Sequence, residues 1–100
     1  MWRLEATDPE LVFRLLPRSM KTMGRAARAD FVVDVALVSR LHCRLSLDNL
    51  NRLDVEDLGS TNGTWVNGRK VKRATLRAGD KLKIGRVEFT VKAEKTAPAG

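Results

Sequence analysis

The stretch that decides the fold reads LDVEDLGSTNGTWVNGRKV and covers residues 53–71. Apolar and polar residues alternate at its start, and this period of two is typical of a half-buried β-strand. A loop of glycine and small polar residues follows at 58–64 and runs into a short apolar strand at 64–66. Asn67-Gly68 then predicts a tight β-hairpin, because both residues tolerate a positive φ. The stretch therefore predicts short strands joined by a polar loop and a hairpin turn.

The same alternation recurs on both sides of this stretch. Further strands are predicted where apolar residues alternate or cluster between turn residues, at 2–6, 11–16, 31–33, 43–47, 82–84 and 87–91. No segment keeps a 3.6-residue apolar repeat over three turns, so no α-helix is predicted. About ten short strands with regular turns are typical of an all-β sandwich, which is the fold class that we predict.

Length and composition fit one globular domain. The chain has 100 residues, of which 43 % are hydrophobic and 31 % charged, and this excludes a disordered or collagen-like protein. We expect the domain to cover residues 1–93, and residues 94–100, which lose all apolar periodicity, to be a linker or tail. No apolar run approaches the roughly 18 residues that cross a bilayer, and the first residues lack the apolar core of a secretion signal. We therefore expect no membrane association.

Cysteine and histidine are too few for a disulfide or a structural zinc site. Cys43 is the one cysteine and His42 the one histidine, so neither an internal disulfide nor a Cys/His zinc site can be assembled. Cys43 lies in an alternating strand and is expected to be a small, buried apolar side chain. We expect an intracellular location and no metal or cofactor.

The excess of positive charge is concentrated near the end of the chain. Residues 1–68 hold nine Lys/Arg and nine Asp/Glu, residues 69–100 hold ten Lys/Arg and three Asp/Glu, and the net charge is +7. A basic surface attracts anionic partners, such as nucleic acid or phosphorylated or acidic protein. A solvated face that keeps the protein soluble explains the same charges equally well. Charge alone leaves both interpretations open.

Three loops carry the residues suited to binding an anion. They are Gly24-Arg25, residues 38–42 and residues 58–64, and they contain two guanidinium groups, small hydroxyls, a carboxamide and glycines but no carboxylate. Arginine offers a planar fork that matches phosphate oxygens, and Ser or Thr hydroxyls and backbone N–H groups complete such a site. Loops on a rigid scaffold often carry function. The sequence therefore predicts an anion site formed by these loops.

The same segments resemble the forkhead-associated (FHA) domain family. The resemblance spans residues 24–85 and rests on motifs in the family's order: Gly24-Arg25, Ser39-Arg40-Leu41-His42, GSTNGT at 59–64, Asn67-Gly68 and LRAGDKLKIG at 76–85. It implies a β-sandwich of about 11 short, mainly antiparallel strands. It also implies a phosphothreonine-dependent protein–protein interaction module for signalling, which binds phosphothreonine peptides of a partner protein through loops at one end. We expect the isolated domain to be monomeric.

The resemblance implies a role for each matched loop residue. Arg25 is expected to pair with the phosphate, and Arg40 is expected to face it as well. Ser39 and Thr61 are expected to donate hydroxyl hydrogen bonds to the phosphate. Asn62 is expected to hold the peptide backbone beside the phosphothreonine.

Other matched residues are expected to support the site. His42 should tie the loops together without touching the ligand, and Gly24, Gly59 and Gly63 should permit tight backbone paths. In some relatives the residue two before the loop serine reads the peptide position three after the phosphothreonine. Here that residue is Leu37, which favours an aliphatic side chain at that peptide position.

Two other function classes fit the residues less well. An enzyme with Ser39 as nucleophile and His42 as base is one alternative. The sequence has no carboxylate near these residues to orient the imidazole and no Gly-x-Ser-x-Gly motif around Ser39, so no catalytic residue is expected. A nucleic-acid-binding domain that uses the basic last third is the other alternative, although the chain has only five aromatic residues and no nucleic-acid motif. Trp2 and Trp65 lie in apolar strand patterns and are expected in the core.

The start of the chain suggests one biological setting. Met1-Trp2 directly ahead of the domain resembles the amino-terminal FHA domain of a DNA-repair scaffold. This resemblance implies a DNA-damage role, and a location in the nucleus rather than the cytoplasm.

Overall fold

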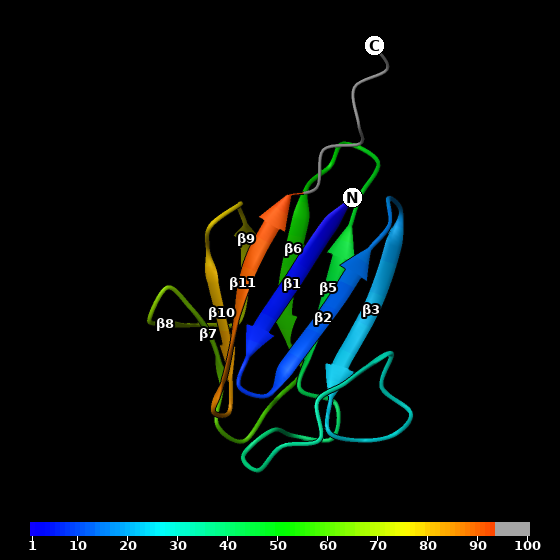
Figure 1. Cartoon of the computed structure of the whole chain (residues 1–100). Coiled ribbons are helices and arrows are strands. Elements are labelled where there is room, and N and C mark those ends of the chain that lie inside the picture. The colour runs from blue at the N-terminus through cyan, green and yellow to red at the C-terminus, as the bar shows by residue number, and fades with distance from the viewer. Residues whose placement is uncertain (94–100) are drawn as a thin grey trace.

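The computed structural model describes residues 1–93, which form eleven β-strands and no helix (Figure 1), and hence no helix that could cross a bilayer. In chain order the strands are β1 (Trp2–Thr7), β2 (Glu10–Leu15), β3 (Ser19–Gly24), β4 (Phe31–Val32), β5 (Cys43–Leu47), β6 (Leu53–Asp57), β7 (Thr64–Val66), β8 (Arg69–Val71), β9 (Arg73–Leu76), β10 (Lys81–Ile84) and β11 (Val87–Ala93). The all-β prediction is confirmed. The expected linker or tail, residues 94–100, lies outside the described residues.

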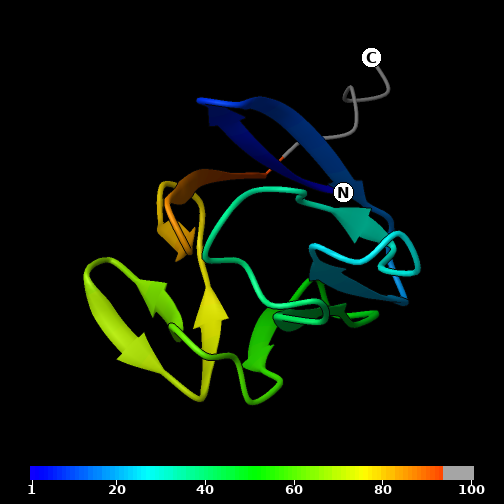
Figure 2. The same ribbon diagram turned by 90° about the horizontal axis from the view of Figure 1, so that it is seen from below.

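The strands form two sheets that pack face to face (Figures 1 and 2). The six-stranded sheet has the order β2-β1-β11-β10-β7-β8, and the five-stranded sheet has the order β4-β3-β5-β6-β9. Every pairing between described strands is antiparallel except that of β3 with β4. The predicted sandwich of mainly antiparallel strands is therefore confirmed.

Inward-facing residues of both sheets form the core. Leu82, Ile84 and Phe89 of the six-stranded sheet are fully buried, as are Leu45 and Val55 of the five-stranded sheet. One outward residue separates each of them from the next inward residue of its strand, as the period of two predicts. Full burial of one such side chain stabilises the fold by about 1.5–3 kcal/mol. The alternation thus determines which face of each strand turns inward.

Cys43 lies in this core at the start of β5 and is fully buried. Burial, with a smaller effect of the Asp57 carboxylate, raises the pKa of the thiol to about 12. The thiol therefore stays protonated and unreactive at neutral pH. The interpretation of Cys43 as a small apolar side chain is confirmed.

The Asn67-Gly68 turn joins β7 to β8 as a tight hairpin, as the sequence predicts. Asn67 has a φ of 50° and Gly68 a φ of 80°, the left-handed values that this turn needs at both central positions. The Asn67 side chain also accepts a hydrogen bond from the Lys81 N–H at 2.9 Å and donates one to the Asp80 carboxylate at 3.0 Å. These bonds fix the hairpin against the start of β10.

The two tryptophans lie in different environments. Trp2 is 7 % exposed in the core, as predicted, but Trp65 is half-buried on the outer face of the six-stranded sheet, so the predicted core position of Trp65 is wrong. In the three-residue strand β7, Thr64 and Val66 are buried instead. The Thr64 hydroxyl tolerates burial because it donates a hydrogen bond to the Asp57 carboxylate at 2.7 Å. Since Thr64 turns inward, Trp65 turns outward.

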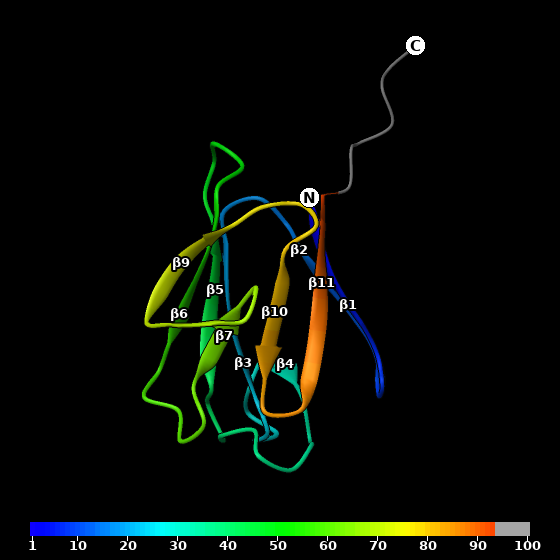
Figure 3. The same ribbon diagram turned by 90° about the vertical axis from the view of Figure 1, so that its left-hand side faces the viewer.

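Three loops gather at one end of the sandwich, the lower end in Figures 1 and 3. They are the β3–β4, β4–β5 and β6–β7 loops. β3 and β6 end there, and β5 and β7 begin there (Figure 1). The turn between β10 and β11 reaches the same end (Figure 3). The fold thus brings together segments that lie far apart in the sequence.

Candidate functional site

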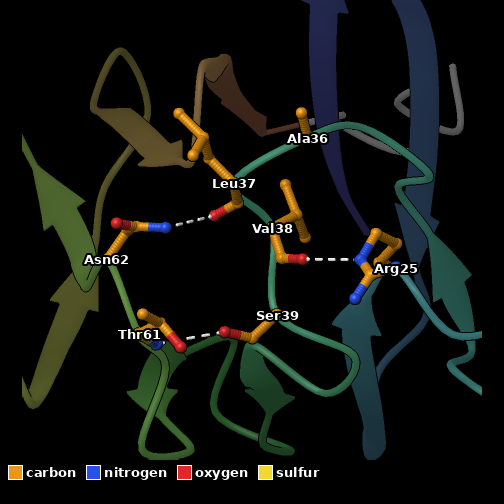
Figure 4. A pocket seen from close by; sticks show the side chains of 7 residues that line it. All are labelled: Arg25, Ala36, Leu37, Val38, Ser39, Thr61 and Asn62. Carbon is orange, nitrogen blue, oxygen red and sulfur yellow. Dashed lines mark hydrogen bonds between the residues drawn. The ribbon is translucent and has the colours of Figure 1, made fainter.

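The loops at this end form an open pocket of about 310 Å³, called the loop pocket below (Figure 4). Its lining comes from Arg25 after β3, residues 36–39 before β5, and Thr61 and Asn62 before β7. Four of the five residues expected to bind the ligand, including Ser39, therefore line one pocket. None of its lining residues is a carboxylate.

Arg25 is held at the edge of the loop pocket by two hydrogen bonds. Its backbone N–H donates to the Ser39 carbonyl oxygen at 2.9 Å, and its Nε donates to the Val38 carbonyl oxygen at 3.1 Å (Figure 4). The residue is exposed, and its two terminal guanidinium nitrogens have no partner within residues 1–93. These nitrogens are available to donate to an anion.

Thr61 and Asn62 lie across the pocket from Arg25, and Ser39 lies between them and Arg25 (Figure 4). The Thr61 N–H donates to Ser39 Oγ at 3.1 Å, which leaves the Ser39 hydroxyl proton available for a ligand. Asn62 Nδ2 donates to the Leu37 carbonyl oxygen at 3.0 Å. The two bonds join the β6–β7 loop to the β4–β5 loop, so the pocket wall is a single hydrogen-bonded unit.

Leu37 adopts an unusual backbone conformation in this wall. Its φ is 74°, a left-handed value that costs a residue with a Cβ roughly 1–2 kcal/mol. Strained residues of this kind are concentrated at binding sites. No local sequence signal predicts it, because leucine rarely adopts a positive φ. Leu37 lines the loop pocket and is 49 % exposed, so its side chain is accessible to a ligand.

His42 connects the loops from inside the protein. The residue is fully buried, and its backbone N–H donates to the Met23 carbonyl oxygen at 2.9 Å. Nδ1 accepts a hydrogen bond from the Ser39 N–H at 3.0 Å, so Nε2 carries the ring proton and donates to the Gly63 carbonyl oxygen at 2.8 Å. The residue thus joins β3, the β4–β5 loop and the β6–β7 loop without lining the pocket. This geometry fits the supporting role expected for it.

Gly24 is required by close packing against backbone, and Gly63 by its left-handed backbone conformation. A Cβ on Gly24 would lie 2.1 Å from the Arg40 carbonyl oxygen, so the close approach of β3 to the β4–β5 loop requires glycine. Gly63 has a φ of 88°, and a Cβ there would lie 2.7 Å from Cε of Lys70. Gly59 has a φ of 74° with open space around it.

Arg40 is the expected ligand-binding residue that does not line the loop pocket. It is exposed, and its carbonyl oxygen accepts a hydrogen bond from the Ala26 N–H at 3.1 Å. That bond fixes the backbone of Arg40 but not its side chain. The contact between Arg40 and a phosphate therefore stays a prediction.

Asp57 organises the β6–β7 loop, and sequence reasoning misses it. Its carboxylate accepts hydrogen bonds from the N–H groups of Gly59 and Ser60 at 3.1 Å each, from the Thr64 hydroxyl at 2.7 Å and from the Ser60 hydroxyl. The Ser60 hydroxyl in turn accepts a bond from the Gly63 N–H at 2.9 Å. An aspartate shortly before a Gly-Ser pair is the signal that could have found it, because aspartate side chains bond to N–H groups two and three residues on.

Replacing Asp57 with asparagine is expected to destabilise the fold by about 1–3 kcal/mol, because several donors lose a charged acceptor. Burial raises the pKa of the Asp57 carboxyl, but hydrogen bonds from Ser60, Thr64 and Gly59 outweigh it and hold the pKa below its usual value. A carboxyl with a lowered pKa in the folded state stabilises the fold above its unfolded pKa of about 4 and loses this contribution as the pH falls through the folded value.

Urea unfolding of wild type and Asp57→Asn at a series of pH values measures this contribution. The difference in unfolding free energy should be constant from about pH 7 to pH 5 and should shrink below about pH 4. A difference that stays unchanged down to about pH 2 would show that the ionised carboxylate is not the stabilising group.

The fold is an antiparallel β-sandwich, and the pocket at its loop tips combines arginine, hydroxyl and amide groups, a chemistry suited to an anion. A family model of the FHA domain matches residues 21–85. The chain belongs to the FHA domain family, and the resemblance seen in the sequence is confirmed.

Known relatives resemble this chain in sequence or in structure. The glycogen accumulation regulator GarA of Mycobacterium tuberculosis is 40 % identical over 72 residues, which are 72 % of this chain and 44 % of GarA. The chain thus spans less than half the length of this curated relative. The FHA domain of CT664 from Chlamydia trachomatis has a TM-score of 0.87 and 28 % identity, and the match covers 94 % of this chain and 98 % of that one.

A second solved structure comes from a structural and functional analysis of phosphothreonine-dependent FHA domain interactions. It has a TM-score of 0.87 and 29 % identity, and the match covers 95 % of this chain and 98 % of that one.

Proposed function

We propose that the chain is a phosphothreonine-dependent protein–protein interaction module in signalling. The observation that carries the proposal is that Arg25, Ser39, Thr61 and Asn62 converge on one open pocket whose lining has no carboxylate. Membership of the FHA family supports it, because a structurally similar FHA domain comes from an analysis of phosphothreonine-dependent interactions.

The phosphate group binds in the loop pocket beside Arg25. The terminal nitrogens of Arg25 and the hydroxyls of Ser39 and Thr61 donate to the phosphate oxygens. A phosphothreonine carries a charge of about −1.5 to −2 and three strong acceptor oxygens, whereas threonine has one neutral hydroxyl. Each hydrogen bond to a charged group contributes about 1.5–3 kcal/mol, so the loss of three or four removes several kcal/mol. The unphosphorylated peptide therefore hardly binds.

The rest of the peptide contacts the remaining lining. Asn62 uses its amide oxygen to accept a peptide N–H, since its amide nitrogen already donates to Leu37. The apolar wall of Ala36, Leu37 and Val38 takes the γ-methyl group of phosphothreonine and an aliphatic side chain further along the peptide. The exposed Arg40 reaches the phosphate by rotation of its side chain.

The same geometry supports binding without catalysis. Both ring nitrogens of His42 are engaged by backbone groups, the Ser39 N–H and the Gly63 carbonyl oxygen. Neither nitrogen is left to take a proton from the Ser39 hydroxyl, as a general base would.

We propose that this interaction takes place inside the cell. The expected nuclear location gains no support, because the named relatives come from bacteria, which have no nucleus. The DNA-damage role likewise gains no support from these relatives. No specific observation favours a nucleic-acid-binding function for the basic last third.

Calorimetric titration with matched peptides tests the proposed function. An oriented phosphothreonine library selects a peptide, which is compared with its unphosphorylated and phosphoserine forms. We expect a Kd of about 1–100 µM for the phosphothreonine peptide, a Kd at least about a hundredfold weaker for the unmodified peptide, and an intermediate Kd for the phosphoserine peptide. Equal affinity for the phosphorylated and unmodified peptides would refute the proposal.

A further inference from the structure

A second hollow lies on the outer face of the six-stranded sheet, next to the loop pocket. This hollow, called the Trp65 groove, has a volume of about 450 Å³ and is lined by Trp65, Gly68, Lys81, Lys83, Gly85 and Glu88. It follows β10, whose 4 residues span roughly 13 Å. The groove therefore fits an extended peptide segment of about four residues.

Basic side chains flank the indole of Trp65. The strand register places Lys70 of β8 and Lys83 of β10 directly opposite Trp65, one on each side. Both lysines are exposed and make no hydrogen bond or ion pair with any other described residue. Lys81 adds a positive charge to the lining, which contains one carboxylate, that of Glu88. The groove is therefore aromatic and positively charged.

The Trp65 groove lies next to the loop pocket, although the two share no lining residue. The indole N–H of Trp65 donates to the carbonyl oxygen of Asn62 at 3.1 Å, and Asn62 lines the loop pocket. Gly85, at the other side of the groove, packs against the pocket wall, since a Cβ there would lie 2.9 Å from Cγ2 of Val38. A peptide that leaves the loop pocket beside Asn62 therefore passes close to the groove.

We propose that the Trp65 groove binds an acidic segment of the phosphoprotein partner, adjacent to its phosphothreonine. This proposal rests on the phosphothreonine-binding function proposed above. Carboxylates of the segment pair with Lys83 and Lys70, and its apolar groups pack on the indole. The unpaired lysines favour an acidic segment over an apolar or basic one. Because the groove adjoins the proposed phosphothreonine site, a segment of the same peptide is favoured over a nucleic acid.

Fluorescence anisotropy with tailed peptides tests the proposal. The short phosphothreonine peptide from the library is compared with versions that carry four Asp/Glu residues on the amino or the carboxyl side, and with versions that carry Asn/Gln tails. Wild type should bind one of the acidic-tailed peptides about three- to tenfold more tightly than the short peptide, a gain typical of a few exposed ion pairs. The neutral tails should give no gain.

Two variants locate the gain in the groove. Lys83→Gln should lose most of the gain in affinity for the acidic-tailed peptide. Its Kd for the short peptide should stay within about twofold of the wild-type value. Arg77→Gln is the charge-matched control, because Arg77 is exposed in the β9–β10 loop outside the groove, and it should keep the gain. The acidic-tailed peptide should also change tryptophan emission in wild type but not in Trp65→Phe.

Several results would overturn the proposal. The first is no gain with either acidic tail. The second is an equal loss of the gain in Lys83→Gln and Arg77→Gln, which would indicate long-range attraction alone. The third is Lys83-dependent binding of a single-stranded oligonucleotide that is tighter than binding of the acidic tail. Failure of the short phosphopeptide to bind would contradict the phosphothreonine function itself. Binding of the short phosphopeptide without any gain from an acidic tail would contradict only the proposal for the Trp65 groove.

Discussion

Replacing Arg25 with alanine is expected to weaken binding of the phosphothreonine peptide at least about a hundredfold. Arg25 carries the only positive charge among the described residues that line the loop pocket. Its two free terminal nitrogens can each donate a charge-assisted hydrogen bond to phosphate, at about 1.5–3 kcal/mol per bond, and two such bonds correspond to a factor of more than about 100 in Kd. Calorimetric titration measures the change.

Arg25→Ala should stay folded, because it loses only the hydrogen bond from Nε to the Val38 carbonyl oxygen, which contributes about 0.5–1.5 kcal/mol of stability. Arg28→Ala is the matched control, since Arg28 is exposed in the same β3–β4 loop but does not line the pocket. It should change the Kd less than about threefold. Arg25→Lys keeps the charge but loses the planar fork, so its affinity should be intermediate. An Arg25→Ala protein that binds as well as Arg28→Ala would remove the basis for the assigned role.

Replacing His42 with alanine should destabilise the domain by about 3–5 kcal/mol. The buried ring is the partner of both the Ser39 N–H and the Gly63 carbonyl oxygen. Each group left unpaired costs about 1–3 kcal/mol, and the cavity adds to this. A small domain has only about 5–15 kcal/mol of stability, so thermal unfolding followed by circular dichroism should show Tm lowered by about 15–30 °C.

His42→Ala should also weaken phosphopeptide binding about tenfold at a temperature where the variant is folded, because the ring preorganises the two loops that form the pocket. Leu53→Ala is the control. Leu53 is fully buried at the end of β6 that lies away from the loops, and its loss costs a comparable 2–5 kcal/mol or so. Leu53→Ala should lose stability but keep its affinity. Equal losses of affinity in both variants would mean that His42 acts only through general stability.

Most strands of the fold were predictable from sequence, because inward and outward residues alternate along them and because the turns contain residues that favour turns, such as Asn and Gly. The hairpin at Asn67-Gly68 is one such case, since both positive φ values come from residues that favour them. The strands β3 and β9 were not predicted, and the inward face of β7 was predicted wrongly at Trp65. A strand of three residues holds too few positions to distinguish its two faces, and a hydrogen bond between Thr64 and Asp57 makes the choice.

The residue types of the site were predictable, but its shape was not. Arg25, Ser39, Thr61 and Asn62 belong to local motifs whose chemistry suits an anion, so the sequence predicts them as candidates, and the structure places them in one pocket. Their convergence depends on tertiary contacts that no motif encodes.

Two of these contacts show why. Gly24 passes so close to the Arg40 carbonyl oxygen that no Cβ fits between them. Leu37 takes a left-handed conformation that its own side chain disfavours, and its carbonyl oxygen accepts a hydrogen bond from Asn62. Both involve contacts between loops that are distant in sequence.

An NMR titration of nitrogen-15-labelled protein with the phosphothreonine peptide and its unphosphorylated twin tests most directly that the phosphate binds between these loops. We predict that the phosphorylated peptide causes the largest chemical-shift changes at Arg25, Ser39, Thr61 and Asn62, and that the unphosphorylated peptide causes almost none. If the largest changes fall on another surface while these four signals stay in place, the loop pocket is not the phosphate site.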